Sequence, residues 1–145
     1  MDKLIGRVIQ KIEVDKHEQQ YLVFETDVGR LVYCAYGDCC SESWFADITG
    51  VDALLGGRVV AVEGVDMGWV SEEKDKRCRQ EHDQLYGYKL TTDKGRAEIV
   101  FRNSSNGYYG GWIDEVEEIH KDGPAEFETI TDDWSASAPL KTYPR

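Results

Sequence analysis

The sequence predicts an α+β protein, in which a mainly antiparallel sheet is built from hairpins and is joined by one or two short helices and an irregular acidic C-terminal tail. The main observation is that β-branched and aromatic runs come in pairs separated by short turns with glycine, which is typical of β-hairpins. The second is a short segment with the start and stop signals of a helix. The 145 residues suit one domain, which we place at residues 1–119, with a flexible tail at 120–145. The alternative is that the isolated side chains of Phe127, Ile130 and Trp134 dock the tail on the domain or on a partner.

The first hairpin is the clearest element of the prediction. Residues 7–14 and 20–26 have strand composition, and residues 30–36 follow the second run after the turn Asp27-Val28-Gly29. The glycine in this turn can adopt the positive φ that a tight hairpin requires. We therefore expect the second and third runs to pair as neighbouring antiparallel strands.

A short helix is expected at residues 47–55. Thr49 can cap its N-terminus, with Asp52 three positions further on, and the pair Gly56-Gly57 can end it in the left-handed region. A further helical turn is expected at residues 41–45, where serine can start it. Together with an antiparallel sheet, these helices give the α+β class.

The second half of the chain is expected to add four more strands, at residues 58–65, 85–92, 96–102 and 111–119. Continuous valine and alanine in the first of them predict a buried central strand. The middle two flank a glycine turn and predict a second hairpin. Between the first and second, residues 71–83 hold five acidic and four basic side chains, which predicts an exposed charged excursion.

The chain is strongly acidic, since 28 acidic residues against 17 basic ones give a net charge of −11. Such a charge repels the phosphates of nucleic acids, so direct nucleic-acid binding is not expected. It suits a protein partner with a basic surface, although a strong net charge also serves solubility alone. No apolar run is long enough for a signal peptide or a membrane span, which predicts a cytoplasmic protein with no membrane partner.

The cysteines raise two chemical alternatives, a zinc site and a thiol catalyst. Cys78 and His82 have the spacing of a ligand pair, but the neighbours Cys39 and Cys40 point to opposite sides of an extended segment, so no tetrahedral set is expected. A catalytic thiol needs a base within reach, which the sequence does not place, and the common catalytic motifs are missing. We therefore expect free thiols, no metal, no cofactor, no catalytic residue and no enzymatic activity, with a zinc-stabilised module or thiol enzyme as the alternative.

The residues expected to bind a ligand or partner lie in two segments. In FRNSSNGYYGGW, residues 101–112, the polar side chains can bond local backbone groups, and the rings at its exit can stack on a base or anchor a protein. The alternative is an ordered hairpin loop whose rings enter the core. The segment YGDCCSESWF, residues 36–45, is expected to share a surface with it. The predicted binding residues are Asp38, Trp44, Arg102, Asn103, Ser105, Asn106, Tyr108, Tyr109 and Trp112.

Three motifs resemble a family of small uncharacterised proteins. They are GDCCSESWF at residues 37–45, YGYKLTTDKGR at 86–96 and FRNSSNGYYGGW at 101–112, and the similarity covers about residues 4–112. The family that they resemble is associated mainly with bacteriophage and actinobacterial genomes. The resemblance implies an accessory protein of a phage or mobile element. It implies no known activity, so no catalytic or binding residue is carried over from it.

These observations together predict a phage-associated, non-enzymatic accessory protein. We expect it to counter host defence by binding and inhibiting a host defence protein with a basic surface, in the host cytoplasm. The alternative is a sponge for a nucleotide immune signal, with Trp112 or the tyrosines before it stacking on the base and Arg30 or Arg102 meeting phosphate. A structural virion component and self-association through strand edges or the aromatic loop stay open.

Overall fold

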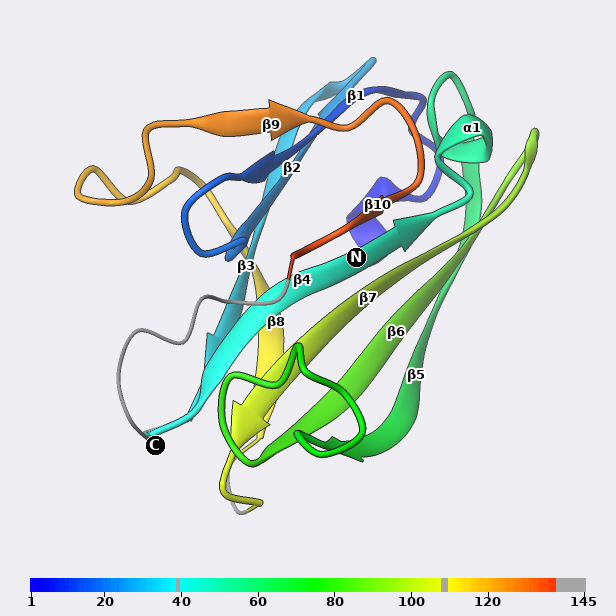
Figure 1. The fold of residues 1–145 in the computed structure, drawn as a ribbon. Coiled ribbons are helices and arrows are strands. Elements are labelled where there is room, and N and C mark those ends of the chain that lie inside the picture. Colours follow the sequence, from blue (N-terminus) through cyan, green and yellow to red (C-terminus); the bar gives the residue numbers. More distant parts are fainter. Residues whose placement is uncertain (39, 108–109, 138–145) are drawn as a thin grey trace.

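Two five-stranded antiparallel sheets pack face to face in the computed structural model, which describes residues 1–38, 40–107 and 110–137 (Figure 1). The first sheet has the order β8-β3-β2-β1-β9, and these strands span Gly111–Val116, Gly29–Gly37, Tyr21–Thr26, Ile9–Asp15 and Phe127–Thr129. The second has the order β10-β4-β7-β6-β5, and these strands span Trp134–Ser135, Glu42–Thr49, Gly95–Ser105, His82–Thr92 and Val59–Ser71. The helical elements are η1 at Asp2–Leu4 and α1 at Val51–Leu54.

The α+β prediction is wrong, because nearly all of the regular structure in the described ranges is antiparallel β and the fold is a β-sandwich. The helical turn expected at residues 41–45 belongs to β4 instead, where Phe45 pairs with Phe101 of β7. Strand β4 pairs with β7 on one side and with β10 on the other. Its backbone groups are therefore used in the sheet, and pairing outweighs the local helical signals.

The expected helix at residues 47–55 is reduced to the single turn α1. Thr49 is the last residue of β4 and does not cap the helix, because Gly50 takes the N-cap position with a φ of 74° and no side-chain cap bond is made. The turn ends at Leu55, which is already extended. No helix in the described part of the chain is long and apolar enough to cross a membrane.

Both predicted hairpins are confirmed, but the position of β5 is not as expected. β2 and β3 pair up to Thr26 and Gly29, and β6 and β7 pair up to Thr92 and Gly95. The valine-rich run starts an edge strand and not a buried central one, and Val60 is 57% exposed. A continuous apolar run is compatible with either position, because composition does not show which strands will become neighbours.

The core lies between the sheets, where alternate residues of each strand point inward. In the first sheet Phe24 and Tyr33 meet edge to face, with 6.0 Å between ring centroids. In the second sheet the rings of Phe45 and Phe101 lie 6.5 Å apart. Because the inner faces are filled in this way, accessible polar and aromatic groups lie on the outer faces and along the edges of the sheets.

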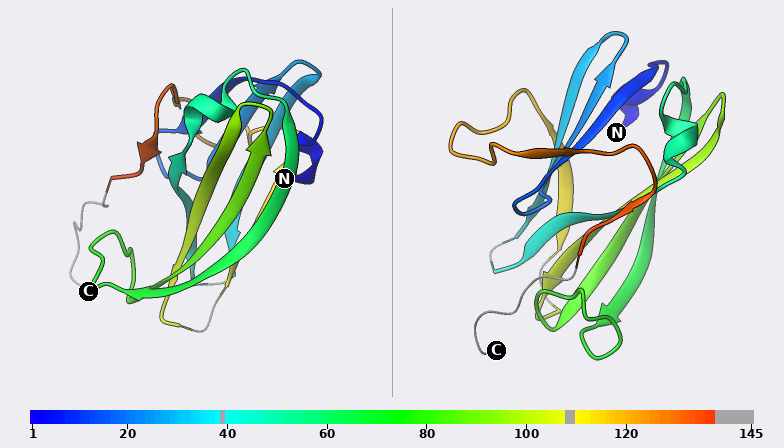
Figure 2. Two further views of the ribbon diagram at one scale, coloured as in Figure 1. Left: turned by 90° about the vertical axis from the view of Figure 1, so that its right-hand side faces the viewer. Right: turned by 45° about the horizontal axis from the view of Figure 1, so that its top comes forward.

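Residues 117–137, which we call the C-terminal strap, lie along one side of both sheets (Figure 2). The strap adds β9 to the edge of β1 and β10 to the edge of β4. Between these two strands the side chain of Ile130 is buried, and its N–H donates to the Ile12 carbonyl at 2.8 Å. The composition predicts a flexible acidic tail from residue 120, whereas a few isolated apolar side chains dock the segment on the domain.

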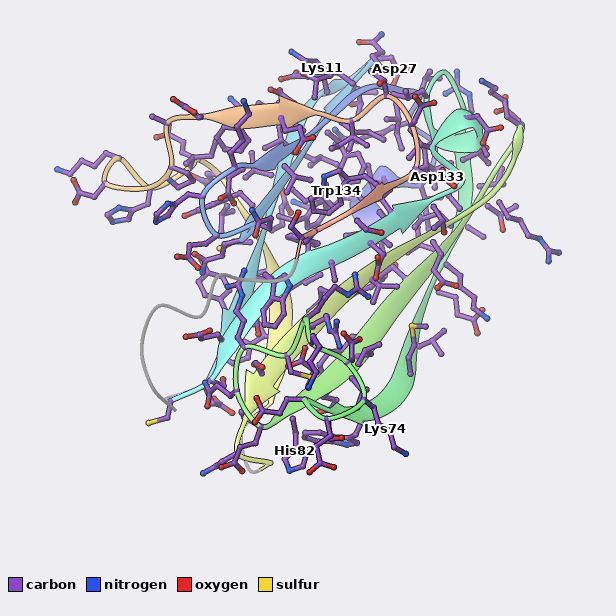
Figure 3. All side chains as sticks on the ribbon, viewed as in Figure 1. Lys11, Asp27, Lys74, His82, Asp133 and Trp134 are labelled. Atoms are coloured by element: carbon purple, nitrogen blue, oxygen red, sulfur yellow. The ribbon has the colours of Figure 1, made fainter. Side chains whose placement is uncertain are left out.

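The strap is also held where it passes the end of β4 (Figure 3). The Asp133 carboxylate accepts the Val51 N–H at 3.1 Å, at the start of α1. The neighbouring Trp134 indole donates to Glu128 at 3.3 Å, and its ring packs partly against the core. These contacts join the strap to the second sheet as well as to the first.

Candidate functional site

The segments YGDCCSESWF and FRNSSNGYYGGW meet in space. Gly37 pairs with Gly111 across β3 and β8, and the Ser43 hydroxyl donates to Asn103 Oδ1 at 2.8 Å. A Cβ atom at Gly111 would collide with the Ser43 hydroxyl and come within 2.9 Å of the Asn103 side chain. Glycine at this position therefore lets the two sheets approach closely.

Most of the predicted binding residues whose positions are described are buried, because β7 runs to Ser105 and not only to the expected end at residue 102. The buried ones are Trp44, Arg102, Asn103 and Ser105. The exposed ones are Asp38, Asn106 and Trp112. Two further ones, Tyr108 and Tyr109, lie outside the described residues. The structure therefore leaves Trp112 as the accessible aromatic group of this prediction among the described residues.

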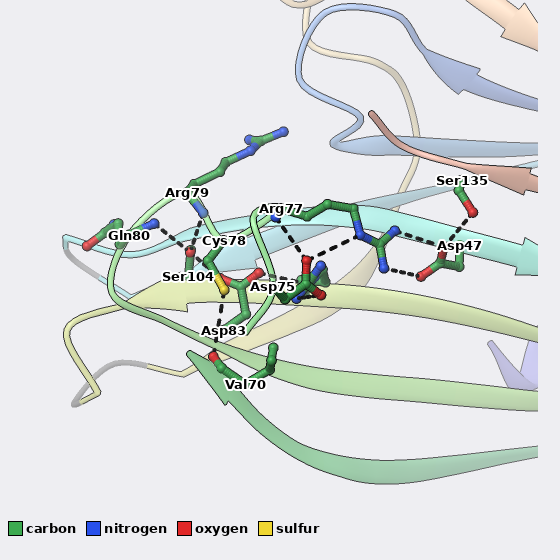
Figure 4. Close-up of polar contacts among 11 residues, drawn as sticks. Asp47, Val70, Asp75, Arg77, Cys78, Arg79, Gln80, Asp83, Ser104 and Ser135 are labelled. Atoms are coloured by element: carbon green, nitrogen blue, oxygen red, sulfur yellow. Dashed lines mark hydrogen bonds and ion pairs between the residues drawn. The ribbon is translucent and has the colours of Figure 1, made fainter. Parts of the chain in front are cut away.

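A charged cluster that includes Asp75, Asp83 and Ser104 lies on the outer face of the second sheet (Figure 4). The buried Arg102 belongs to this cluster. Its Nε lies 2.7 Å from Asp83 Oδ2, and its Nη2 donates to Asp75 Oδ2 at 2.8 Å. The Ser104 hydroxyl donates to the other Asp83 oxygen and accepts the Gln80 N–H at 2.9 Å. Two carboxylates thus neutralise the guanidinium, and Arg102 is not accessible to a phosphate.

The charged segment that the sequence predicts as an exposed excursion, residues 71–83, packs on this outer face. Arg77 donates to both oxygens of Asp47, at 3.0 and 3.3 Å. The Arg79 guanidinium lies 4.0 Å from the centroid of the Trp44 ring, a cation–π contact that covers this side chain. Acidic and basic side chains in similar numbers allow the segment to pair with the sheet although it has almost no apolar residues.

The thiols are separated in the structure. Cys78 is fully buried, with its sulfur 3.7 Å from the Val70 carbonyl, Cys34 is buried in the first sheet, and Cys40 is exposed. Among the described residues no group of three or more His, Cys, Asp or Glu side chains is arranged to hold a metal ion. Burial raises the pKa of Cys78 to about 11 and also raises that of Cys34. Both buried thiols are therefore protonated near neutral pH, which makes them poor nucleophiles.

Alkylation is expected to separate these cysteines in the folded protein. With a pKa of about 11, roughly one Cys78 side chain in a thousand is a thiolate at pH 8, so Cys40 should react with iodoacetamide at least about a hundred times faster. Peptide mass spectrometry after timed labelling measures both rates, and labelling in urea should remove the difference. Similar rates for the two thiols in the folded protein would contradict the burial of Cys78.

The raised pKa of Cys78 also gives stability a pH dependence. The folded chain keeps this thiol protonated up to a pH of about 11, whereas the thiol of an unfolded chain ionises near its ordinary value of 9.0. The protonated thiol therefore contributes fully to the free energy of unfolding below about pH 9. This contribution is lost as the pH rises toward 11.

The open side of the sandwich lies opposite the C-terminal strap, and its edge strands are β8 and β5. A groove with a volume of about 310 Å³ lies there between β8 and the strands β5 and β6. We call it the open-side groove; Asp66, Tyr86, Tyr88 and Phe101 line it from the second sheet, and residues 111–113 of β8 border it. The groove forms because the inner face of β6 extends beyond the edge of the opposite sheet.

Two ring stacks lie on the open side, one inside the groove and one on the outer face of β3 and β8. Phe101 stacks with Tyr86 at 4.7 Å between centroids and with Tyr88 at 6.2 Å. Trp112 stacks on Tyr36 at 5.9 Å with an angle of 26° between the rings. Trp112 is 42% exposed and stands on the outer face of the first sheet, since it pairs with Tyr36 of the outer cluster while the next residue, Ile113, packs against the core.

Asp66 is the charged residue of the described groove lining. Its Oδ1 accepts the Gly68 N–H at 2.9 Å, and its Oδ2 accepts the Gln84 amide N–H at 3.3 Å. The Gln84 carbonyl in turn accepts the Tyr86 hydroxyl at 2.6 Å. These bonds orient the carboxylate, and its charge makes the groove more suitable for a cation than for an anion.

An acidic edge adjoins the groove on β8 and directly after it. It consists of the exposed residues Asp114, Glu115, Glu117 and Glu118. Asp114 accepts the indole N–H of Trp112 at 3.0 Å, and Glu115 forms an ion pair with Lys3 at 2.6 Å. Trp112 and Asp114 lie on the same face of β8, so the exposed ring and the acidic edge form one surface beside the open-side groove.

Sequence reasoning missed three groove residues, Asp66, Tyr86 and Tyr88. The sequence predicts packing roles for the two tyrosines because they lie in a hairpin. The available signal is their spacing of two, which places both rings on one face of β6. That this face extends beyond β8 depends on how the sheets pack, which the spacing does not show.

A larger hollow, with a volume of about 640 Å³, lies between the β1–β2 turn and residues 122–126. Its buried carboxylate belongs to Asp15, which accepts four backbone N–H groups, those of His17, Glu18, Gln19 and Tyr21. Asp15 is therefore engaged in shaping the turn. The open side, which offers an accessible carboxylate in the groove and an exposed ring at its border, is the better candidate site.

Comparison with known proteins gives a family without a known function. The chain is 29% identical over 116 residues to "Uncharacterized protein L278" of Acanthamoeba polyphaga mimivirus, which covers 78% of this chain and 86% of the relative. No solved structure matches the chain. The expectation of an uncharacterised family is thus confirmed and a viral relative is found, while the association with bacteriophage and actinobacteria stays a prediction. Residues 2–114 match the family described as Domain of unknown function (DUF7448), and the chain belongs to this family.

Proposed function

We propose that this protein is a non-enzymatic viral accessory protein that counters host defence by binding and inhibiting a host protein through its open side. The observation that supports this most strongly is the contact between the exposed ring of Trp112 and the acidic edge. Trp112 and Asp114 lie two positions apart on β8 and are joined by a hydrogen bond of 3.0 Å. An exposed aromatic anchor beside a charged rim has the composition of a protein–protein interface.

The charge of the acidic edge favours a partner with a basic surface. The chain carries a net charge of −11, and four carboxylates lie close together at this edge. Such a field attracts and orients a basic protein before contact, which raises the association rate. The mimivirus relative supports a viral role.

The same surface is poorly suited to a nucleotide. Arg102 is buried between two carboxylates. The Arg30 Nε lies 3.7 Å from Glu25 Oε1 in the β2–β3 hairpin, so both guanidinium groups already have acidic partners. The described lining of the groove contains Asp66 and no basic side chain. A phosphate placed there would be repelled by this carboxylate. These contacts favour a protein partner over a nucleotide signal.

Charge reversal of the acidic edge tests the proposal. The variant carries Asp114→Lys, Glu117→Lys and Glu118→Lys, and it leaves the Lys3–Glu115 ion pair intact. The control makes the same change in charge at exposed acidic residues elsewhere, Asp52, Glu73 and Glu81. A host protein recovered with the wild type and the control, but not with the edge variant, is the expected partner. With the purified partner, we expect the edge variant to bind at least about tenfold more weakly and with a smaller dependence on salt.

Two results would count against this proposal. If both variants lose affinity equally, the net charge matters and not the edge. If neither variant changes affinity or salt dependence, the open side does not bind the partner. Discovery of the protein as a component of purified virus particles would favour a structural role instead.

A further inference from the structure

We propose that the partner binds through an extended segment that pairs with the free edge of β8 and carries basic and apolar side chains in alternation. This inference rests on the proposed function, because it names the element of the partner that the open side recognises. Three observations carry it: the unpaired edge of β8, the groove beside that edge, and the acidic residues on β8 and directly after it.

The edge of β8 is free for main-chain pairing. Among the described strands β8 pairs with β3 alone, from Gly111 opposite Gly37 to Val116 opposite Val32. The backbone N–H and C=O groups on its other side therefore have no described strand as a neighbour, and groups of this kind can bind an added strand. The strand has six residues and no proline, which gives a partner segment enough length to pair.

The open-side groove offers space for alternate side chains of such a segment. Because neighbouring strands lie about 4.8 Å apart, a segment paired with β8 would lie across the groove, over the inner faces of β5 and β6. The surface beneath it includes the half-buried rings of Tyr86 and Tyr88 and the backbone of Gly64. Every second side chain of the segment would point onto this surface, so apolar residues suit these positions.

The other side chains of the segment would meet the acidic edge. Asp114 points to the outer face of β8, and Glu117 and Glu118 follow the strand. Side chains that face each other on paired strands interact directly, so basic residues suit the outer positions of the segment. The chain already places one basic group here, because the Lys3 ammonium lies 2.6 Å from the Glu115 carboxylate.

A second copy of this chain fits the edge of β8 less well than a basic partner. Pairing of two β8 strands would bring two acidic edges together on molecules that each carry a net charge of −11. Like charges on adjacent strands are destabilising, and the repulsion of the whole molecules slows their encounter. The charges therefore favour a basic segment of another protein.

Capped heptapeptides test this pairing on the full-length protein. The first alternates lysine and valine, the second has the same residues in two blocks, and the third alternates glutamate and valine. Binding is followed by the backbone amide signals of β8 in NMR spectra. We expect the alternating lysine peptide to bind at least about tenfold more tightly than the other two, because it alone presents valines to the groove and lysines to the acidic edge.

N-methylation of the alternating lysine peptide tests the main-chain bonds directly. In a strand, successive N–H groups point to opposite sides, so only every second one faces β8. We therefore expect methylation of one alternate set to weaken binding by at least about tenfold, and methylation of the other set to change it by no more than about twofold.

Matched variants of the protein assign the peptide to the groove. Gly64→Leu would fill the groove, since a Cβ atom at Gly64 already stands 3.6 Å from the Tyr88 ring, and it should weaken the alternating lysine peptide by about tenfold. Ala61→Leu is the control, because Ala61 lies on the same strand, is exposed and lines a separate hollow. It should leave the affinity unchanged, and circular dichroism checks that both variants are folded.

Pairing at β8 is overturned if the block peptide binds as tightly as the alternating one, or if both N-methylated sets bind equally well. A dimer of the protein that the alternating peptide dissociates, measured by sedimentation, would assign the edge to a second copy and overturn the basic partner. If reversal of the acidic edge abolishes host-protein binding while the alternating peptide does not compete with the host protein, strand pairing is wrong and the proposed function stands. If neither that reversal nor Gly64→Leu changes host-protein binding, the proposed function and this inference are both wrong.

Discussion

Replacement of Arg102 by methionine is expected to lower the free energy of unfolding by about 3–5 kcal/mol, which is the usual effect of removing one partner of a buried ion pair. Arg102 and Asp83 are both fully buried, and 2.7 Å separates Nε from Oδ2. Without the guanidinium, Asp83 would remain as a buried charge beside the Ser104 hydroxyl and the Cys78 thiol, neither of which carries a positive charge. Urea unfolding at pH 7 measures the loss.

The pH dependence of this loss identifies its cause. Burial raises the pKa of Asp83, while the Ser104 hydrogen bond and the charge of Arg102 oppose the rise. In the Arg102→Met variant the pKa of Asp83 should therefore rise further. A carboxyl whose pKa is raised by folding contributes most stability below its unfolded pKa of about 3.9, and this contribution is lost as the pH rises. The deficit should thus be smaller at pH 5 than at pH 7.

A double variant provides the control for this prediction. In Arg102→Met/Asp83→Asn the uncompensated charge is gone and the side-chain oxygen can still accept the Ser104 hydrogen bond, so much of the lost stability should return. If the single and double variants are equally unstable, or if the deficit of the single variant does not depend on pH, the loss comes from packing and not from charge.

Replacement of Ile130 by alanine is expected to lower the free energy of unfolding by about 2–5 kcal/mol. The side chain is 2% exposed and belongs to the core between the sheets, although it lies in the C-terminal strap. Its removal leaves a cavity and also weakens the attachment of β9 and β10. Thermal or urea unfolding measures the effect.

Thr131→Ala is the matched control for Ile130→Ala, because Thr131 is the next residue along the strap and its side chain is exposed. It should change stability by no more than about 0.5 kcal/mol. If Ile130→Ala is equally mild, the strap contributes no core contact and behaves as the flexible tail that its composition suggests.

The hairpins could be predicted because their signals are local. Alternating strand residues and a turn glycine specify β2–β3 and β6–β7 without knowledge of the rest of the chain. The signals at Thr49 and Asp52 are equally local, but pairing of β4 on both sides overrides them. Ile130 gives a weaker signal, because an isolated apolar side chain in an acidic segment can dock but its sequence does not show where, and its position depends on a distant contact with Ile12.

The candidate site was only partly predictable for the same reason. Trp112 could be selected because it directly follows a glycine-rich segment, and the structure shows that it is exposed. Arginine is a residue type that often binds ligands, but Arg102 lies in the buried cluster with Asp83. Asp66 could not be selected, since nothing in the sequence shows that β5 and β8 border one groove. Contacts between the two sheets are a property of the packed fold.

The C-terminal strap gives the molecule a single face for adding further strands. Unpaired strand edges are templates to which other chains can add, and very short outer strands block such addition. On the strap side both sheets end in strands of this kind, since β9 has three residues and β10 has two. Strand addition is therefore favoured at the flank formed by β8 and β5, whose edge strands have six and thirteen residues.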